Sequence, residues 1–389
     1  MSIKVRSFMS LLLLGLMVVM IVPVASMAEE AAPAAAPAAA PPPAPPFTIS
    51  GFVDTYYGYN FNVPKSQQNQ LPTTNFDFNS NGFSLNLAEL VVSKTAAPVG
   101  FRMDFDYGPT TDFVHCGAVN CPPGAPEAVY KNIQQAYVTW ATPFKLTLDM
   151  GKFVTHMGNE VIESKDNWNY TRSLLFCCAI PYYHTGVRGN YPINDKLYIN
   201  GYFYNGWNNA TENNGIKTFG TQIGITPIAP LQLILNWIGP EEVPGVYKSK
   251  QVYDPIITYN ATDSLSFAVD YNYGTQKDAA DNKQRYSGVA GYARWKVDPY
   301  ALAVRYEVTD DPDNIMFGGT NDVNLNGNKI KELTLTAEHT ISGSLLTRLE
   351  YRMDKSDDKI YEFKDSATNP LTSPKDSQSR VILSAVYMF

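Results

Sequence analysis

The sequence predicts an all-β fold, a transmembrane antiparallel up-and-down β-barrel of about sixteen strands. Most of the chain after residue 46 consists of segments of about ten residues in which apolar and polar side chains alternate, as in strands with one face in lipid. The links between these segments alternate between short and long. A secretory leader is followed by no run of 18 apolar residues, which leaves a closed barrel as the way to span a membrane.

The composition fits this fold class and excludes several others. Of 389 residues, 44% are hydrophobic and only 17% are charged, against roughly 25% charged in ordinary globular proteins. This apolar content is too high for a disordered chain. The formal charge of −7, with no long basic run, argues against nucleic acid as a partner. Four cysteines in a chain of this length do not make a disulfide scaffold.

The first 28 residues have the features of a secretory signal peptide. Lys4 and Arg6 precede an apolar run over 11–24, and small residues at 26 and 28 favour cleavage after Ala28. The alternative is a membrane anchor, but the apolar run is short for a span. We therefore expect a signal peptide over 1–28 and export of the rest of the chain.

Residues 29–46 form a low-complexity Ala/Pro segment that packs no core. We interpret it as a periplasmic linker in front of the barrel, and a tether to the cell wall or to a partner is the alternative. The outer-membrane barrel is then expected over 47–389.

Period-2 alternation locates the strands and is clearest in 101–107, 231–237 and 264–273. The segments 83–95 and 285–297 alternate poorly, so the expected strand number is accurate to within two. The expected strands are 47–61, 83–95, 99–108, 130–141, 144–156, 182–191, 197–206, 217–227, 231–238, 253–260, 264–274, 285–297, 300–308, 330–341, 344–353 and 378–389.

Short and long links alternate along this series, which favours a barrel over a β-sandwich. An up-and-down barrel with both termini on the turn side requires this two-sided asymmetry. The short links are 96–98, 142–143, 192–196, 228–230, 261–263, 297–299 and 341–343. The long links lie near 62–82, 109–129, 157–181, 207–216, 239–252, 275–284, 309–329 and 354–377.

The last expected strand ends on an aromatic residue with no tail. Val381, Leu383, Ala385, Tyr387 and Phe389 form one apolar face. This end resembles the C-terminal strand of bacterial outer-membrane proteins, which is read by the barrel-insertion machinery. An ordinary final strand is the alternative. We expect Tyr387 and Phe389 to act as the barrel-assembly signal, with outer-membrane lipid and the assembly machinery as partners.

Two central stretches, 167–176 (NWNYTRSLLF) and 181–188 (PYYHTGVR), resemble the putative beta-barrel porin-2 (OmpL-like) family. The opening 51–57 (GFVDTYY) and the segment 204–208 (YNGWN) resemble it too. The resemblance covers nearly the whole mature chain, and it implies an outer-membrane pore whose substrate is little defined.

Polar residues on the expected strands should line the lumen, because the apolar ones face lipid. Opposed rows of acidic and basic side chains would orient passing solutes. The alternative is that these side chains pair across strands and merely neutralise one another. The lumen candidates are Asp54, Arg102, Asp104, Asp106, Asp149, Arg188, Asp270, Arg294, Arg305, Glu307, Glu332, Glu338, Arg348, Glu350 and Arg352.

The third long link, 157–181, is expected to form the pore constriction. Its segment 172–180 is too apolar for an exposed loop, and folding it against the wall would bury that surface and narrow the channel. The alternative is an external loop that its neighbours or a subunit cover. The constriction candidates are Glu160, Glu163, Lys165, Asp166 and Arg172.

Cysteine spacing predicts one loop disulfide. Cys116 and Cys121 flank four residues in the second long link, and an oxidising compartment favours their pairing. The adjacent Cys177 and Cys178 could form a vicinal disulfide, remain thiols or bind metal. His115, His156 and His184 are distant in the sequence, so no metal site is predicted.

No catalytic or cofactor motif stands out. The chain has no Cys-x-x-Cys-His, so no haem of its own is expected and no cofactor is predicted. A hydrolase would need a nucleophile beside a base, and His184 with Thr185 or Ser173 is the one suggestive grouping. Neighbouring strand residues point to opposite faces, so we expect no enzyme.

These observations favour a porin, a water-filled barrel through which small hydrophilic solutes or ions diffuse passively. One alternative is a barrel sheath or scaffold for a partner protein such as an electron-transfer cytochrome. Another is a surface adhesin that uses the long loops. A homo-oligomer, such as a trimer, is compatible with each.

Overall fold

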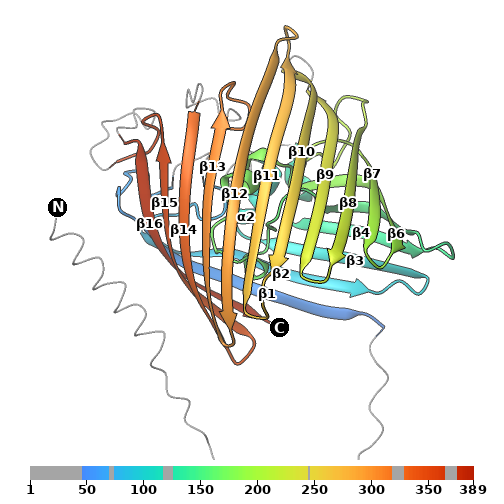
Figure 1. The fold of residues 1–389 in the computed structure, drawn as a ribbon, viewed down its shortest axis with the longest axis horizontal. Helices are drawn as coiled ribbons and strands as arrows, with labels where there is room; N and C mark the ends of the chain where they lie inside the picture. The colour runs from blue at the N-terminus through green and yellow to red at the C-terminus, as the bar shows by residue number, and fades with distance from the viewer. Residues whose placement is uncertain (1–45, 70–73, 117–125, 244–245, 318–327, 364–374) are drawn as a thin grey trace, which may run out of the picture. The chain divides into compact units, whose positions relative to one another are not determined.

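The computed structural model describes residues 46–69, 74–116, 126–243, 246–317, 328–363 and 375–389. In this described part, the chain from residue 47 onward forms one closed barrel of sixteen antiparallel strands. Each strand pairs with the next along the chain, and the last strand pairs with the first (Figure 1). Closure leaves no sheet edge with unpaired backbone groups, which is the condition for a sheet in lipid.

In the part of the chain that the structure describes, sixteen strands are joined by loops, two of which carry short helices. The strands are β1 (Thr48–Asn60), β2 (Gly82–Lys94), β3 (Val99–Tyr107), β4 (Ile133–Ala141), β5 (Thr147–Val154), β6 (Tyr183–Asn194), β7 (Leu197–Tyr204), β8 (Thr218–Ile228), β9 (Leu231–Val243), β10 (Tyr247–Asn260), β11 (Leu265–Asp278), β12 (Lys283–Val297), β13 (Tyr300–Asp311), β14 (Asn328–Ile341), β15 (Leu345–Ser356) and β16 (Ser377–Met388). The β3–β4 loop carries α2 (Pro109–Cys116) and the 3₁₀ helix η1 (Pro126–Tyr130). The β5–β6 loop carries the 3₁₀ turn η2 (Ser164–Asp166) and the π-helix η3 (Leu175–Ala179). Within the described ranges, no helix has the length and apolar content to cross a membrane.

Each of the expected strands is present, so the prediction of an antiparallel up-and-down barrel is confirmed. The expected loops 239–252 and 275–284 are wrong in extent, because β9 to β12 run through most of them. The expected turn 192–196 shortens to two residues, since β6 ends at Asn194 and β7 begins at Leu197. Backbone hydrogen bonds between strands do not require apolar side chains, so these hairpins continue where the alternation stops.

The poor alternation of 83–95 has a structural cause. Asp54 of β1 faces Leu87 of β2, whereas Thr55 faces Leu85, which leaves Asn86 as an extra residue. Such a β-bulge reverses the faces on which the following side chains lie. Asn86 Nδ2 donates to Asp54 Oδ2 at 2.9 Å, so the bulged residue joins the buried side chains.

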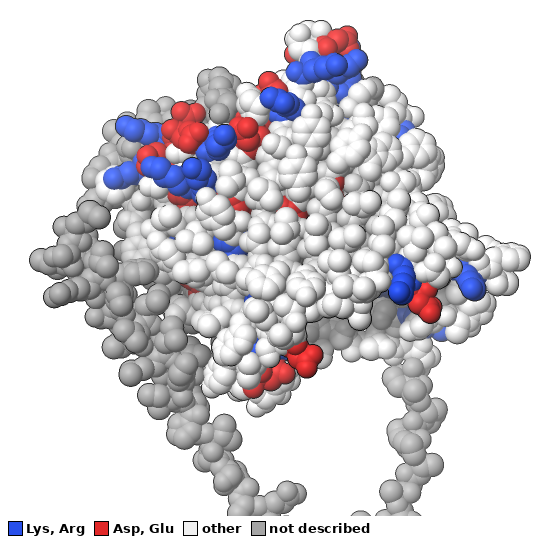
Figure 2. Space-filling model, viewed as in Figure 1, with Lys and Arg blue, Asp and Glu red and all other residues white. Residues whose placement is uncertain are grey.

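The outer wall of the barrel is apolar. Exposed apolar residues recur at alternate positions, such as Val269 and Tyr271 in β11 and Leu383 and Tyr387 in β16. Figure 2 shows the middle of the visible wall largely without charge, with Lys, Arg, Asp and Glu gathered near its upper and lower rims. This band matches the surface that an outer-membrane barrel presents to lipid.

The loops supply much of the buried apolar core. Phe76 comes from the β1–β2 loop, Phe113 from α2, and Phe176 from the β5–β6 loop. The ring centroid of Phe76 lies 6.3 Å from that of Phe113 and 5.8 Å from that of Phe176. Three loops therefore pack together in one apolar cluster.

The barrel closes where the chain ends. Gly51 of β1 and the terminal Phe389 exchange two backbone hydrogen bonds, each of 3.0 Å. A Cβ atom added to Gly51 would lie 2.3 Å from the Glu89 carbonyl oxygen and 2.7 Å from the Phe389 ring. Glycine therefore permits the close approach of β2 and the last aromatic side chain. The assembly role of Tyr387 and Phe389 stays a prediction.

Replacing Gly51 by valine should destabilise the folded barrel by about 1–3 kcal/mol, the usual cost of overpacking. The added side chain would collide with backbone, which cannot move as a flexible side chain can. The free energy of unfolding in detergent micelles is the quantity to measure. Gly201→Val in β7 is the control, because a Cβ atom there has no neighbour within 4 Å. Equal losses in the two variants would contradict the closure described.

Candidate functional site

The loop between β5 and β6, residues 155–182, lies against the inner wall of the barrel. It is called the third loop below. Near its start, the Gly158 amide donates to Asp254 Oδ2 at 2.5 Å and the Asn159 amide donates to Asp270 Oδ2 at 3.1 Å. Asp254 and Asp270 are buried on β10 and β11, so these strands hold the first turn of the loop.

Two wall glutamates hold the centre of the third loop. Glu350 of β15 accepts the amides of Tyr170 and Thr171 at 2.6 and 2.9 Å. Glu307 of β13 accepts the amides of Leu174 and Leu175 at 2.6 and 2.7 Å. These four amides have wall carboxylates as acceptors in place of the backbone carbonyl groups that pair the amides of a strand or helix.

Arginines on the same wall satisfy the carbonyl groups of the third loop. Arg348 of β15 donates to the carbonyl oxygens of Ser164 and Asn167, both at 2.7 Å. Arg305 of β13 donates to the Thr171 carbonyl oxygen at 2.7 Å. Arg352 of β15 donates in the same way to the carbonyl oxygen of residue 172, at 2.6 Å. The charged wall of β13 and β15 is thus occupied by one loop.

The apolar segment of the third loop is buried, as its composition predicts. Leu174, Leu175 and Phe176 are each at most 2% exposed. The hydroxyl of Tyr286, on β12, donates to the Ala179 carbonyl oxygen at 2.6 Å. Within the π-helix, Cys177 and Cys178 form a vicinal disulfide, one of the three states that the sequence left open.

The expected constriction charges divide into two groups. Glu160 and Arg172 are buried: Glu160 forms an ion pair with Arg305 of the wall at 2.6 Å, and Arg172 donates to the Val161 carbonyl oxygen of its own loop at 3.0 Å. Lys165 and Asp166 pair at 2.5 Å and their side chains stay 24% and 56% exposed. Glu163 is the third member of this accessible group, and its side chain is half-buried.

Burial raises the pKa of the Glu163 carboxyl, and repulsion from Asp104 and Asp166 acts in the same direction. Desolvation disfavours the charged form of an acid, so this carboxyl loses its negative charge at a higher pH than an exposed glutamate would. Asp166 is the more exposed of the two acids, with a side chain that is 56% exposed, so it is the acid of the loop that solvent reaches most readily.

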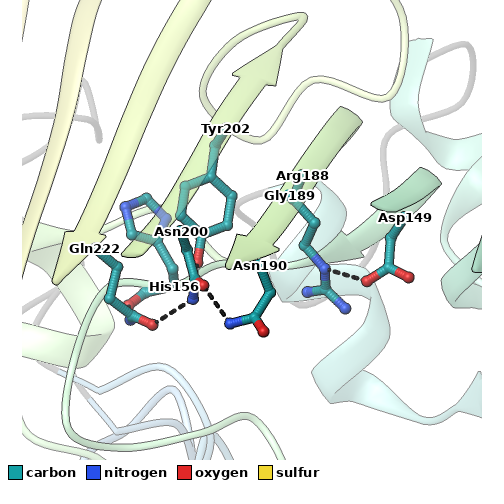
Figure 3. Close-up of a pocket in the computed structure, with 8 residues that line it drawn as sticks. All are labelled: Asp149, His156, Arg188, Gly189, Asn190, Asn200, Tyr202 and Gln222. Carbon is teal, nitrogen blue, oxygen red and sulfur yellow. Dashed lines mark hydrogen bonds and ion pairs between the residues drawn. The ribbon is translucent and has the colours of Figure 1, made fainter. Parts of the chain in front are cut away.

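The wall of β3 to β8 is covered only in part: His115 of α2 contacts Lys152 of β5 at 2.5 Å, and the His156 carbonyl oxygen of the third loop accepts from Gln222 of β8 at 3.2 Å. Arg102 of β3 pairs with Asp104 at 2.9 Å, and Arg188 of β6 pairs with Asp149 of β5 at 2.8 Å. Beside Arg188 lies a cavity of about 300 Å³ that opens between β5 and β8 (Figure 3). Between these contacts, Arg102 and Arg188 keep accessible side chains.

The expected lumen residues lie at inward positions, opposite the exposed apolar ones. Eleven of them are buried: Asp54, Asp104, Asp106, Asp270, Arg305, Glu307, Glu332, Glu338, Arg348, Glu350 and Arg352. Four keep partly accessible side chains: Arg102, Asp149, Arg188 and Arg294. Most of these charges form ion pairs or hold the third loop, as the pairing alternative anticipates.

Sequence reasoning missed several wall residues. Asp254 of β10, which holds Gly158, lies between the exposed Tyr253 and Ile257, and this alternation could have found it. Arg380 of β16 lies 3.3 Å from Asp77 of the β1–β2 loop. That pairing joins distant segments, so no local pattern signals it.

The remaining predicted sites are the cysteine pair of the β3–β4 loop and the histidines. Cys121 lies outside the described residues, so its disulfide with Cys116 stays a prediction. His184 hydrogen-bonds with the Gly206 carbonyl oxygen at 2.9 Å and with the Thr155 hydroxyl at 3.2 Å. Over the described ranges, His, Cys, Asp and Glu form no group of three or more that could hold a metal ion.

The role of Glu307 in holding the third loop can be tested by substitution. Glu307→Ala should leave the buried amides of Leu174 and Leu175 without acceptors, at roughly 1–3 kcal/mol for each unsatisfied group. Hydrogen exchange at these two amides should then accelerate by at least about tenfold, the equivalent of 1.4 kcal/mol.

The matched control is Asp311→Ala on the same strand, β13. Asp311 accepts amides of the β13–β14 loop, at 2.9 Å from Ile315 and Met316. This variant should accelerate exchange at those amides and leave the third loop protected. If both variants expose the same amides, Glu307 does not anchor the third loop.

Comparison with known proteins identifies the family of the chain. The model of the family described as "Putative beta-barrel porin-2, OmpL-like" matches residues 46–389. No curated protein matches the chain. Among solved structures, the anion-selective porin from Comamonas acidovorans gives a TM-score of 0.58 at 12% sequence identity, covering 88% of this chain and 99% of that chain.

Two further solved structures have a similar fold. The outer membrane channel DcaP of Acinetobacter baumannii has a TM-score of 0.56 at 12% identity, over 88% of this chain and 97% of its own. Salmonella typhi OmpF has a TM-score of 0.55 at 9% identity, over 88% and 97%. At these identities the likeness shows the barrel fold alone. The family match is independent of them and spans the whole barrel, and the chain belongs to the putative beta-barrel porin-2, OmpL-like family.

Proposed function

We propose that this barrel is an outer-membrane porin through which small hydrophilic solutes or ions diffuse passively. The observation that carries the proposal is the inside of the closed barrel, where charged and amide side chains leave a polar cavity open along β5 to β8. The apolar outer band and membership of a porin family support the same function. Such a pore needs no energy source and no catalytic group.

The third loop would constrict this pore. It occupies the side of the lumen lined by β10 to β15, so the water path would run between the loop and the wall of β3 to β8. Lys165, Asp166 and Glu163 would face Arg102 and Arg188 across that path. Opposed charges at a narrow point set ion preference, because little water screens them.

Compartment and assembly follow from the same proposal. The segment 1–28 would be a signal peptide cleaved after Ala28, and 29–46 a periplasmic linker; both lie outside the described residues except for Pro46. Outer-membrane lipid and the barrel-assembly machinery would be the partners during insertion. A trimer is one candidate assembly, and a trimer form is named for the Vibrio cholerae barrel OmpT, which has a TM-score of 0.53 to this chain.

The alternatives have less support. A sheath around a partner protein needs a wide lumen, but the chain's own third loop occupies part of it. An adhesin would use the outer loops, and among the described ones the β1–β2, β3–β4 and β5–β6 loops pack into a shared core. For a hydrolase, His184 would have to activate Ser173, whereas His184 hydrogen-bonds with Gly206 and Thr155.

Planar-bilayer recording tests the proposal. The purified protein should give stable open-channel steps, and reversal potentials in a salt gradient should depend on the accessible loop charges. Lys165→Gln should shift selectivity toward cations, and Asp166→Asn should shift it toward anions. Glu163→Gln should act in the same direction as Asp166→Asn but less strongly, because the side chain of Glu163 is half-buried and that of Asp166 is exposed.

Asp281→Asn is the control for these shifts. Asp281 lies in the hairpin turn between β11 and β12, where its side chain is 61% exposed and pairs with Lys248. Its substitution should leave the reversal potential unchanged. A shift equal to that of Asp166→Asn would contradict the constriction, and a folded protein that gives no channels would contradict the porin.

A further inference from the structure

The arginines of the lumen differ in what their terminal nitrogens do. Arg305 and Arg348 use theirs to hold backbone carbonyls of the third loop. Arg188 on β6 has one hydrogen bond, from Nε to Asp149 Oδ2 at 2.8 Å. Its Nη1 and Nη2 have no acceptor in the described part of the chain, and its side chain is 25% exposed.

The guanidinium of Arg188 is nevertheless fixed in place. It lies over the rings of Phe153 and Tyr137, with its central carbon 4.6 and 4.9 Å from their centroids. Its partner Asp149 is itself held by the Thr139 hydroxyl at 2.5 Å. A guanidinium held by aromatic faces and by its Nε presents its two terminal NH₂ groups in a fixed orientation. They form a fork that can donate two parallel hydrogen bonds to one carboxylate.

Amide side chains line the cavity next to this fork. Asn190 Nδ2 donates to Asn200 Oδ1, and Asn200 Nδ2 donates to Gln222 Oε1 at 2.9 Å. Gln222 Nε2 donates in turn to Asn236 Oδ1 at 2.9 Å, which fixes the direction of the whole chain of amides. Within the described residues, no donor hydrogen-bonds to Asn190 Oδ1, so this oxygen can accept a hydrogen bond from a hydroxyl group of a ligand.

An aromatic pair closes the other end. Tyr202 stacks on His156 with ring centroids 4.1 Å apart and an interplanar angle of 21°. Figure 3 shows both rings on the Gln222 side of the cavity, with Arg188 and Asp149 on the opposite side. The cavity thus has Arg188 at one end, an aromatic pair at the other end and amide side chains between them.

We propose that this cavity binds a monosaccharide-sized sugar acid, with its carboxylate on the Arg188 fork and a hydroxyl group that donates to Asn190 Oδ1. The volume of about 300 Å³ is at the lower end for small-molecule sites and suits one sugar ring. Asp149 adds a negative charge beside Arg188, which favours a single carboxylate over a phosphate or sulfate dianion. The inference deepens the proposed function, because it names the class of solute that the pore would concentrate.

Binding is measured by titration calorimetry on the purified full-length barrel in detergent, with glucuronate as the probe and glucose and sulfate as comparisons. Glucuronate should bind at least about tenfold more tightly than glucose, as expected for one charge-assisted bidentate contact. Arg188→Gln should abolish this preference. Arg102→Gln should retain it, because Arg102 has the same kind of ion pair but lies outside the cavity.

Equal binding of glucose and glucuronate, tighter binding of sulfate, or equal effects of Arg188→Gln and Arg102→Gln would each overturn the proposal. Compact migration of unheated protein on electrophoresis verifies that both variants are folded. The measurement needs no ion current, so it separates the two proposals. A conducting barrel without glucuronate binding refutes the site alone, and a binding barrel that gives no channel refutes the porin alone.

Discussion

The hydrogen bonds between the wall of the barrel and the backbone of the third loop are the interaction on which the interior depends. A loop inside a barrel has no strand partner, and each buried amide or carbonyl left unpaired costs roughly 1–3 kcal/mol. Glu307 and Glu350 supply acceptors, and Arg305, Arg348 and Arg352 supply donors. These buried charged side chains are thus explained by the backbone amides and carbonyl groups of the third loop to which they hydrogen-bond.

This constraint has a second effect, since it divides the lumen. Arg305, Arg348 and Arg352, which hold the loop, are buried, whereas Arg102 and Arg188 keep side chains that are 39% and 25% exposed. The β1–β2 loop adds to the same structure through Asp77, which pairs with Arg380. Two of the lumen arginines that solvent reaches, Arg102 and Arg188, therefore lie on strands that do not hold the centre of the loop.

Much of the fold could be predicted from the sequence, because a barrel strand in lipid has a local signature. Segments such as 264–273 alternate residue by residue, and the apolar centre of 172–180 indicates a buried loop. The extra residue Asn86 in β2 breaks that local rule, and the ends of β9 and β10 extend beyond it. Bulges and strand extensions are set by pairing with a neighbour, which period-2 alternation does not report.

The site could be predicted only by residue type. The sequence identifies Glu160 and Arg172 as charges in a buried loop, but it does not indicate that they bind wall and backbone. Similarly, Arg188 and Arg305 are both arginines at inward strand positions, and only the fold distinguishes the accessible one from the occupied one. Which wall the loop covers is decided by contacts between residues more than a hundred positions apart.

The central claim is that the third loop lies in the lumen and that the water path passes its exposed charges. Single-channel recording of an Asp166→Cys variant, before and after reaction with a bulky charged thiol reagent, tests it most directly. Labelling should lower the conductance in a discrete step, because residue 166 is the most exposed charge on the loop. Asp281→Cys, in the β11–β12 hairpin, should label without a change in current. An unchanged conductance after complete labelling at residue 166 would contradict the account.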